Sequence, residues 1–365
     1  MIYETIFFKP VQFRAGFSKR YFNQNPGNPV KDTMLTRLTL ITIIQLITAL
    51  YSTTYNVFAT ESVATVEQLN TKLINETGSY SVVIHSIATL TNITVNGFKV
   101  TELSGLGWDE DENILYALSD NGYLLHLRPV IKTDQLIDVI FVDGFALKDE
   151  KNRPLKYKKS DSEGITVLNG NNGTPGDTEL LVCFERYPRL VKYMPDGNMI
   201  TEIKIPDPLS DIKNYRSENR SLESVTVHKT LDIMLAPEFS LNGQDSNVMT
   251  VYSINGQSWT IPLYNGHYGA LVDMTTMPDG SLLLLERSYG GLFPVMDITL
   301  HRFTPDNKDD ESEIIYTFSH NNGLFEENFE GITRYKGNQY FMISDDNNHP
   351  LKRILLVYFS IMKTE

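Results

Sequence analysis

The sequence predicts an all-β fold and, within that class, a β-propeller with six blades. Short runs of β-branched and aromatic residues alternate with turn signals, and no long stretch has the period of a helix. Examples of these turns are Asn121-Gly122, Pro195-Asp196-Gly197 and Pro278-Asp279-Gly280. A two-strand unit also recurs roughly every 48 to 60 residues, a spacing that accommodates the four strands and loops of one propeller blade.

The recurring unit begins with a small or acidic residue, followed by glycine and an apolar strand. A turn and a second apolar strand follow, and the second strand ends in an acidic residue. Five copies are visible, over residues 104–120, 163–186, 222–238, 271–287 and 330–346. The region after Ser79 and the strand from Ile354 to Ile361 would together form a sixth blade. Two successive β domains, such as a sandwich and a second domain, are the alternative, but the repeated unit favours the propeller.

The segment before the repeats has the pattern of an export signal. A short basic stretch from Met34 to Arg37 precedes an apolar run from Leu38 to Leu50, and a suitable cleavage site follows at Val57-Phe58-Ala59. The apolar run has about 13 residues, whereas a bilayer span needs ~20. We therefore expect a cleaved signal rather than an uncleaved anchor, and a periplasmic or secreted protein with no stable membrane span after cleavage.

This pattern divides the chain into four expected parts. Residues 1–33 are an extension or a mis-assigned start, 34–59 the signal peptide, 60–78 a linker and 79–365 the propeller.

Composition narrows the expected function. Hydrophobic residues make up 41% of the chain and charged residues 21%, a balance that supports a folded core. Cys183 is the only cysteine, so an intrachain disulfide and a multi-cysteine metal site are excluded. Its apolar neighbours indicate a buried, unreactive thiol. A formal net charge of −13 repels nucleic-acid phosphates, so we expect no nucleic-acid partner and favour divalent cations.

The repeated carboxylates are the candidate site. The first strand of each blade lines a propeller's channel, so Glu163, Glu223 and Glu330 would face one another there. Crowded carboxylates repel one another unless protons, basic side chains or a metal ion offset their charge. Calcium is the best match, because it binds six to eight oxygen ligands. The expected metal ligands are Glu163, Glu223, Glu330 and Asp345. Further suitable oxygens come from Asp120, Asn121, Asp346 and Asn347. Alternatively, each glutamate accepts backbone N–H groups or pairs with arginine and joins neighbouring blades.

Two arginines directly follow acidic strand ends, Arg186 after Glu185 and Arg287 after Glu286. Guanidinium groups bind phosphate or carboxylate oxygens through paired hydrogen bonds, although edge ion pairs explain these arginines equally well. A carboxylate beside them could act as a general base. The expected catalytic set is Glu163, Glu330, Arg186 and Arg287. The usual serine-hydrolase, Walker, zinc-protease and dinucleotide motifs are missing from the sequence.

An ordered set of motifs runs through the chain: Ser104-Gly105-Leu106, Ser119-Asp120-Asn121-Gly122, Asp161-Ser162-Glu163-Gly164-Ile165, Phe184-Glu185-Arg186, Leu285-Glu286-Arg287, Phe329-Glu330-Gly331-Ile332 and Ser344-Asp345-Asp346-Asn347. With these motifs, the chain resembles the phytase-like family described as having esterase-like activity, from about Glu102 to the C-terminus. The resemblance implies an exported propeller that hydrolyses a small-molecule ester or phosphoester.

The copies are uneven. The third reads Glu223-Ser224-Val225 in place of Glu-Gly-Ile, and the fourth has Leu271 where the acid would align. We therefore expect an asymmetric site. The alternative function is a non-catalytic binding propeller with a structural calcium site, and the sequence alone does not separate the two.

Overall fold

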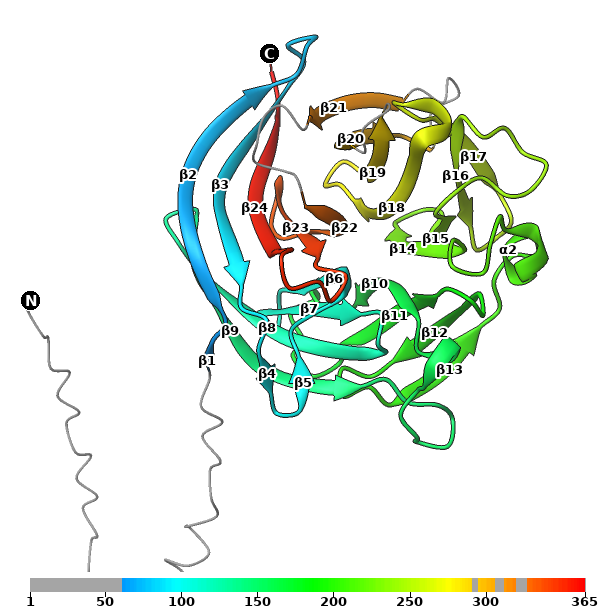
Figure 1. The fold of residues 1–365 in the computed structure, drawn as a ribbon, viewed down its shortest axis with the longest axis horizontal. Coiled ribbons are helices and arrows are strands. Elements are labelled where there is room, and N and C mark those ends of the chain that lie inside the picture. The colour runs from blue at the N-terminus through cyan, green and yellow to red at the C-terminus, as the bar shows by residue number, and fades with distance from the viewer. Residues whose placement is uncertain (1–60, 291–294, 306–311, 320–326, 365) are drawn as a thin grey trace, which may run out of the picture. The chain divides into compact units, whose positions relative to one another are not determined.

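The computed structural model describes residues 61–290, 295–305, 312–319 and 327–364. The expected extension and signal peptide lie outside these residues. The described chain forms five sheets of four or five strands and a two-stranded ribbon of β4 (Thr94–Val95) and β5 (Phe98–Lys99). Figure 1 shows the five sheets arranged around a common centre. The β-propeller class predicted from the sequence is confirmed.

The first four blades are antiparallel sheets whose principal strands follow one another in the chain. In each blade the first of these strands is innermost and the last outermost. The first blade contains β6 (Leu103–Asp109), β7 (Ile114–Ser119), β8 (Tyr123–Lys132) and β9 (Gln135–Ala146), with β1 (Glu61–Ser62) at its outer edge. The second blade contains β10 (Ser162–Leu168), β11 (Glu179–Phe184), β12 (Arg189–Tyr193) and β13 (Met199–Ile203), and the third contains β14 (Leu222–His228), β15 (Asp232–Pro237), β16 (Val248–Ser253) and β17 (Ser258–Pro262). The fourth blade contains β18 (Gly269–Thr276), β19 (Leu282–Gly290), β20 (Val295–Phe303) and β21 (Ser312–Phe318).

The fifth blade joins the two ends of the described chain. Its strand order is β22 (Asn328–Arg334), β23 (Gln339–Asp345), β24 (Ile354–Lys363), β3 (Tyr80–Leu90) and β2 (Ala64–Ile74). The strands that we assigned to a sixth blade are the outer strands of this one, because β3 and β24 pair directly. The described residues therefore form five blades, and the prediction of six blades was wrong.

The segment 60–78, which was expected to be a linker, contributes two strands. Within it, β1 pairs with β9 and β2 pairs with β3. Helical structure in the described residues is limited to short turns: η1 (Tyr157–Lys159), α2 (Asp207–Ser210), η2 (Ile212–Asn214) and η3 (Gly266–Tyr268). None of the helices in this part of the chain is long and apolar enough to span a membrane.

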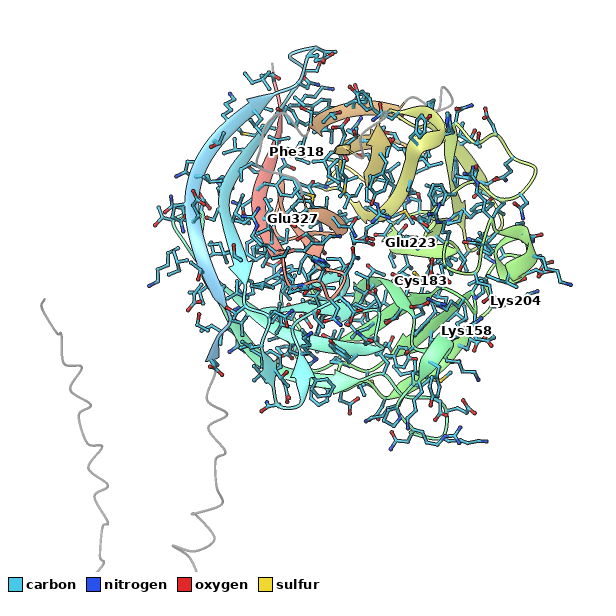
Figure 2. The ribbon with its side chains drawn as sticks, in the orientation of Figure 1. Lys158, Cys183, Lys204, Glu223, Phe318 and Glu327 are labelled. Atoms are coloured by element: carbon cyan, nitrogen blue, oxygen red, sulfur yellow. The ribbon has the colours of Figure 1, made fainter. Side chains whose placement is uncertain are left out.

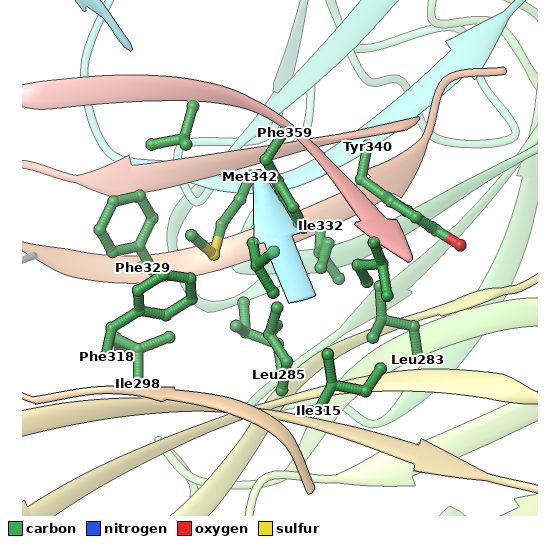
Figure 3. Close-up of a cluster of buried hydrophobic side chains, with 14 of the residues drawn as sticks. Leu283, Leu285, Ile298, Ile315, Phe318, Phe329, Ile332, Tyr340, Met342 and Phe359 are labelled. Carbon is green, nitrogen blue, oxygen red and sulfur yellow. The ribbon is translucent and has the colours of Figure 1, made fainter. Parts of the chain in front are cut away.

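Apolar side chains from neighbouring blades pack against each other and form the core. Figure 3 shows the cluster between the fourth and fifth blades, where Leu285 and Ile298 face Phe329 and Met342. All four side chains are fully buried. Apolar clusters of the same kind join the other blades, so side-chain packing holds the ring together and fixes the positions of the inner strands.

The inner strands β6, β10, β14, β18 and β22 contact one another in ring order. They approach so closely that a Cβ added to Gly105 would lie 2.7 Å from the carbonyl oxygen of Glu163. A Cβ on Gly164 would lie 2.7 Å from the carbonyl oxygen of Glu223. The glycine after the acidic residue in the repeated motif therefore allows the backbones of adjacent blades to pack together.

Candidate functional site

A β-bulge lies near the start of the inner strand in every blade. The pairing between the first and second strands shifts by one residue there, and the extra residue is turned out of the regular alternation. We call these five equivalent residues the bulge ring. Its members, in blade order, are Ser104, Glu163, Glu223, Val272 and Glu330.

A second ring lies beside the bulge ring, at the ends of the second strands. We call it the strand-end ring, and its members are Asp120, Glu185, Glu238, Arg287 and Asp345. The N–H groups of the first three donate to the carbonyls of residues 102, 161 and 221. Arg287 and Asp345 occupy the equivalent places in the fourth and fifth blades, where their antiparallel strand partners are Ala270 and Asn328. The two rings together bring seven carboxylates and one guanidinium to one end of the channel.

The structure corrects our alignment of the fourth copy by one residue. Arg287 is equivalent to Glu185, not to Arg186, and Val272 instead of Leu271 occupies the bulge position. Glu286, which the sequence aligned with Glu185, is fully buried elsewhere. Its carboxylate accepts hydrogen bonds from the Tyr264 N–H at 2.9 Å and from His301 Nε2 at 2.7 Å.

The three expected ligands of the bulge ring come together. Carboxylate oxygens of Glu163, Glu223 and Glu330 lie within 4.8 Å of one another, a spacing at which they could hold a metal ion. Figure 2 shows Glu223 toward the centre of the ring. Two further triads with the same spacing are Asp161, Glu163, Glu185 and Glu185, Glu223, Glu238. The fourth expected ligand, Asp345, belongs to none of the triads, and accepts a hydrogen bond from the Asn347 N–H at 2.8 Å.

Glu223 carries the clearest sign of a missing partner. It is only 5% exposed, and its Oε2 atom is buried without a hydrogen-bond partner among the described residues. An unpaired buried carboxylate oxygen costs free energy unless a proton or a cation satisfies it. At Glu223, therefore, the alternative in which each glutamate simply joins neighbouring blades leaves this oxygen unexplained.

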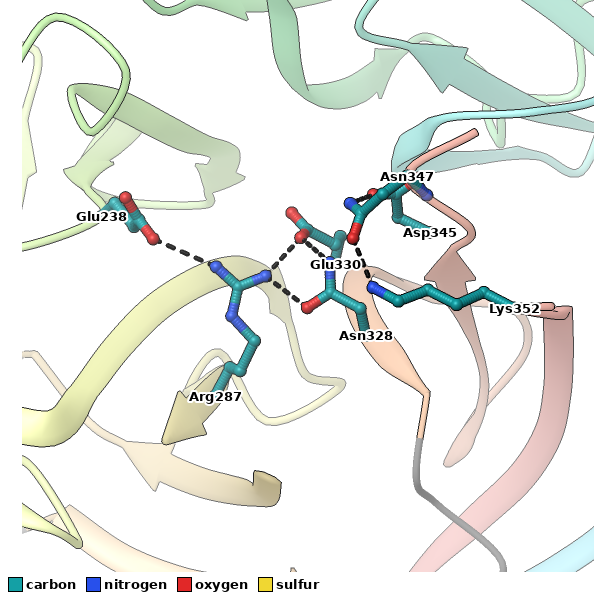
Figure 4. A network of polar contacts seen from close by, with 7 residues as sticks. All are labelled: Glu238, Arg287, Asn328, Glu330, Asp345, Asn347 and Lys352. Atoms are coloured by element: carbon teal, nitrogen blue, oxygen red, sulfur yellow. Dashed lines mark hydrogen bonds and ion pairs between the residues drawn. The ribbon is translucent and has the colours of Figure 1, made fainter. Parts of the chain in front are cut away.

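Glu330, in contrast, does join neighbouring blades. Arg287 donates to Glu330 and, over 2.6 Å, to Asn328 Oδ1. On its other side Arg287 forms an ion pair of 3.0 Å with Glu238 (Figure 4). The guanidinium links the third, fourth and fifth blades and offsets part of the negative charge. Glu330 thus belongs both to the ligand triad and to an ion pair between blades.

Burial raises the pKa of most of these carboxyl groups. It is the main cause for Glu163 and Glu223, whose pKa values lie well above the ordinary one, and repulsion from neighbouring carboxylates adds to it. The pKa of Glu185 rises to about 8, and those of Glu238 and Asp345 to about 7. The cluster therefore holds protons near neutral pH and would release them to a cation.

Burial alone would lower the pKa of Arg287, but the nearby Glu330 and Glu238 outweigh it and raise that pKa above its usual value. Arg287 is thus a fixed positive charge in the cluster. It cannot balance seven carboxylates by itself, so protons or a cation must supply the rest.

Arg186, the other expected arginine, lies at the rim. It pairs with Asp161, and 30% of its side chain is exposed. Asp161 itself belongs to one of the triads, so Arg186 borders the cluster without entering it. The two arginines expected to act together therefore occupy different environments.

Three residues of the cluster were missing from the expected site: Asp161, Glu185 and Glu238. Asp120 was expected only as a further oxygen donor. A signal for Glu185 and Glu238 was present in the sequence, because the second strand of each repeated unit ends in an acid. Only the closed ring shows that these strand ends lie at the level of the bulge ring, since the residues come from different blades.

Comparisons with known proteins give two levels of similarity. No curated protein matches the chain. A crystal structure of Saccharomyces cerevisiae Sqt1 is 8% identical, with a TM-score of 0.37, and covers 83% of this chain and 98% of that one. A protein of unknown function from Bacteroides caccae is 7% identical, with a TM-score of 0.37, and covers 74% and 81%.

A family model gives the more informative match. It is described as phytase-like, with esterase-like activity of phytase, and it matches residues 99–348. The match includes the inner strands of all five blades and every member of the two rings. The chain belongs to the phytase-like family.

Proposed function

We propose that this protein is an exported hydrolase of a small-molecule ester or phosphoester, assisted by a divalent cation, with calcium preferred. The observation that carries the proposal is the buried Glu223 Oε2, which has no hydrogen-bond partner among the described residues, in a carboxylate grouped with those of Glu163 and Glu330. Membership of a family described by esterase-like activity supports the reaction class. The export pattern of residues 34–59 supports a periplasmic or secreted location.

The residues present fit calcium. The donors of the three triads are all carboxylate oxygens, which hard cations such as calcium prefer. Glu163, Glu223 and Glu330 would hold the ion, and Asp345 is the proposed additional ligand. When bound, the cation supplies positive charge that polarises a substrate oxygen and favours attack by water.

Protein groups beside these ligands are suited to proton transfer. Glu238 lies in a triad with Glu185 and Glu223 but is not one of the proposed ligands. Once the cation has displaced protons from the cluster, the Glu238 carboxylate can serve as general base. Arg287 keeps Glu238 and Glu330 in place, and Arg186, with its partly exposed side chain at the rim, is proposed to orient the substrate.

A non-catalytic binding propeller with a structural calcium site is the second candidate. It is favoured by the depth of the cluster, because Glu185, Glu223 and Glu238 are each less than 10% exposed. A substrate would reach these groups only past the more exposed members of the rings. In this alternative the cation would stabilise the closed ring without turnover.

Turnover and metal binding, measured together, separate the two candidates. Purified protein is assayed with p-nitrophenyl acetate, p-nitrophenyl phosphate and phytate, with calcium or with chelator. Calcium-dependent turnover that falls at least tenfold in Glu163→Gln and Glu330→Gln supports the hydrolase. Glu67→Gln is the matched control, because Glu67 is exposed on the outer strand β2.

Two other outcomes reject the hydrolase. Melting that calcium shifts, without turnover of any substrate, supports the binding propeller. Identical melting in calcium and in chelator rejects the metal site in both candidates.

A further inference from the structure

A cavity of about 830 Å³ opens at the other end of the channel. All five blades contribute to its wall, through the last residues of their inner strands and the loops that follow. Four threonines, Thr166, Thr226, Thr275 and Thr333, lie at equivalent positions three residues after the bulge. None of the carboxylates of the two rings lines this cavity, so it is distinct from the candidate metal site.

All five inner strands run in the same direction along the channel, so their first residues lie at one end of it and their last residues at the other. The first residues include the bulge ring, where Gly105 lies beside Glu163. At the other end, Thr275 Oγ1 accepts a hydrogen bond of 3.3 Å from the Arg334 N–H. The bulge ring and Arg334 are four residues apart on β22, roughly 13 Å along the strand. The carboxylates and the cavity therefore occupy opposite ends of the five-stranded channel.

The charges around the cavity are unbalanced toward the positive side. Its two acidic groups are already paired, Glu110 with Lys336 at 3.1 Å and Asp279 with Arg302 at 2.8 Å. Lys229 and Arg334 also line the cavity, and neither has an ion-pair partner among the described residues. Two unpaired cations at one opening stand out in a chain with a formal net charge of −13.

Asp279, one of the two acidic groups, keeps its ion pair with Arg302 at ordinary pH. Burial alone would raise the pKa of Asp279, but hydrogen bonds from Ser281 and Arg302 outweigh it and lower that pKa to about 2. Asp279 therefore stays charged and bound to Arg302.

The remaining wall groups suit a ligand larger than a simple ion. Threonine hydroxyls are neutral donors, and an unpaired guanidinium and ammonium are the groups that proteins use to bind phosphate. Trp108 and Tyr335 supply an aromatic wall, with ring centres 4.7 Å apart. The volume lies within the range of pockets for small organic ligands.

We infer that this cavity is a second ligand site, which binds a phosphate group carried by a small organic molecule. Lys229 and Arg334 hold the phosphate together with the threonine hydroxyls, and the aromatic wall packs against the organic part. The inference is independent of the proposed hydrolase, because it uses none of the carboxylates of the two rings.

Calorimetry and tryptophan fluorescence test this site on the whole protein, in chelator so that the metal site is empty. The chain has two tryptophans, so a Trp259→Phe background leaves Trp108 in the cavity wall as the only reporter. The probes are inorganic phosphate, glucose 6-phosphate and glucose. We expect saturable binding of both phosphates, tighter for glucose 6-phosphate, with a change in Trp108 emission.

The double variant Lys229→Gln/Arg334→Gln should weaken binding of both phosphates at least tenfold. Lys72→Gln/Lys132→Gln is its charge-matched control, because both lysines are exposed on β2 and β8, and it should bind as the wild type does. If the double variant fails to fold, the exposed Lys229→Gln alone should still weaken binding severalfold.

The inference is overturned if neither phosphate binds at millimolar concentration, if the double variant binds them unchanged, or if glucose binds as tightly as its phosphate. Equal affinity for inorganic phosphate and glucose 6-phosphate would keep an anion site and remove the organic part of the ligand. Glu163→Gln should leave phosphate binding intact, which separates this test from that of the proposed hydrolase.

Discussion

Glu223 and Glu330 occupy equivalent positions in the candidate site but differ in the partners of their carboxylates. The Glu223 carboxylate belongs to two of the three triads, and one of its oxygens lacks a partner among the described residues. Glu330 sits in the same ring but is held by Arg287. Two chemically identical residues at equivalent positions therefore have different roles, and the difference arises from the arginine supplied by the fourth blade.

Replacing Glu223 by glutamine should stabilise the metal-free protein and weaken calcium binding. At pH 8.5 in chelator, glutamine removes the cost of burying or protonating this carboxylate on folding, which should raise the free energy of unfolding by roughly 1–3 kcal/mol. The stabilisation by calcium should shrink at the same time. Urea unfolding with and without calcium measures both effects, with Glu67→Gln as control. Lower stability in both conditions would show that the Glu223 carboxylate has a purely structural role.

The raised pKa values predict how stability depends on pH. Burial raises the pKa of Glu185 to about 8 and of Glu238 and Asp345 to about 7. These groups bind more protons in the folded than in the unfolded chain between their ordinary pKa values and these raised ones. In chelator the melting temperature should therefore fall as the pH rises from 5 to 8.

Calcium should flatten this dependence, because the cation replaces the lost protons. Melting followed by circular dichroism at several pH values checks both curves. A melting temperature that rises from pH 5 to 8 in chelator would contradict the pKa shifts.

The sequence predicted the bulge-ring acids correctly as a converging group but could not predict the roles of individual residues. Glu163, Glu223 and Glu330 were recognisable because the motif repeats. The state of each carboxylate depends on neighbours from other blades, such as Arg287 beside Glu330, and a sequence does not show which blades become neighbours. The sequence likewise did not show that Arg186 pairs with Asp161 at the rim while Arg287 lies within the cluster.

The inner strands are the elements that position the site, and their glycines set how closely they pack. Gly164 illustrates this, since an added Cβ would lie 2.7 Å from the Glu223 carbonyl oxygen and 2.9 Å from Cys183 Sγ. Ser224 takes the equivalent position in the next blade, so a side chain is accepted there. The departure in the third copy thus reflects local room between two blades.

Gly164→Ala should lower the free energy of unfolding by about 1–3 kcal/mol, because the added methyl group forces β10 away from β14. Ser224→Ala is the control at the equivalent position and should change stability little. Urea unfolding measures the difference. Cys183 is fully buried, and faster modification of its thiol by a disulfide reagent in Gly164→Ala would confirm the separation. Equal stability of the two variants would reject the close packing.

The Glu286-Arg287 pair, which resembles Glu185-Arg186 in sequence, explains why the fourth copy was misaligned. A bulge adds one residue to the inner strand, and this residue looks like any other in the sequence. Leu271 and Glu286 appeared to match the other copies, but their true counterparts are displaced by one position. Strand content and repeat length could be predicted from turns and apolar runs, whereas the register could not.

At the scale of the whole molecule, the fifth blade decides the number of blades. Its strands come from both ends of the described chain, with β24 paired between β23 and β3. The sequence showed the leftover strands and treated them as a separate blade. Their union with the fifth copy depends on long-range pairing, which local sequence patterns do not encode.

A chain that ends after residue 353 should fail to fold cooperatively, because β3 and β23 both lose their partner. Thermal unfolding should become broad, and the thiol of Cys183 should become reactive. A chain lacking only residue 365, which lies beyond β24, is the control and should melt as the full chain does. Cooperative melting of the shorter chain at the same temperature would show that the ring does not need this closure.

The fifth blade can be completed only after most of the chain has been synthesised. β3 begins at Tyr80, and the strand that covers its free edge begins at Ile354. At ~5–20 residues per second, a ribosome needs roughly 14–55 s to make the intervening chain. Throughout that interval β3 has one unpaired edge, which is the kind of edge through which chains aggregate. The newly made protein therefore depends on being kept apart from other copies until its last strand has emerged.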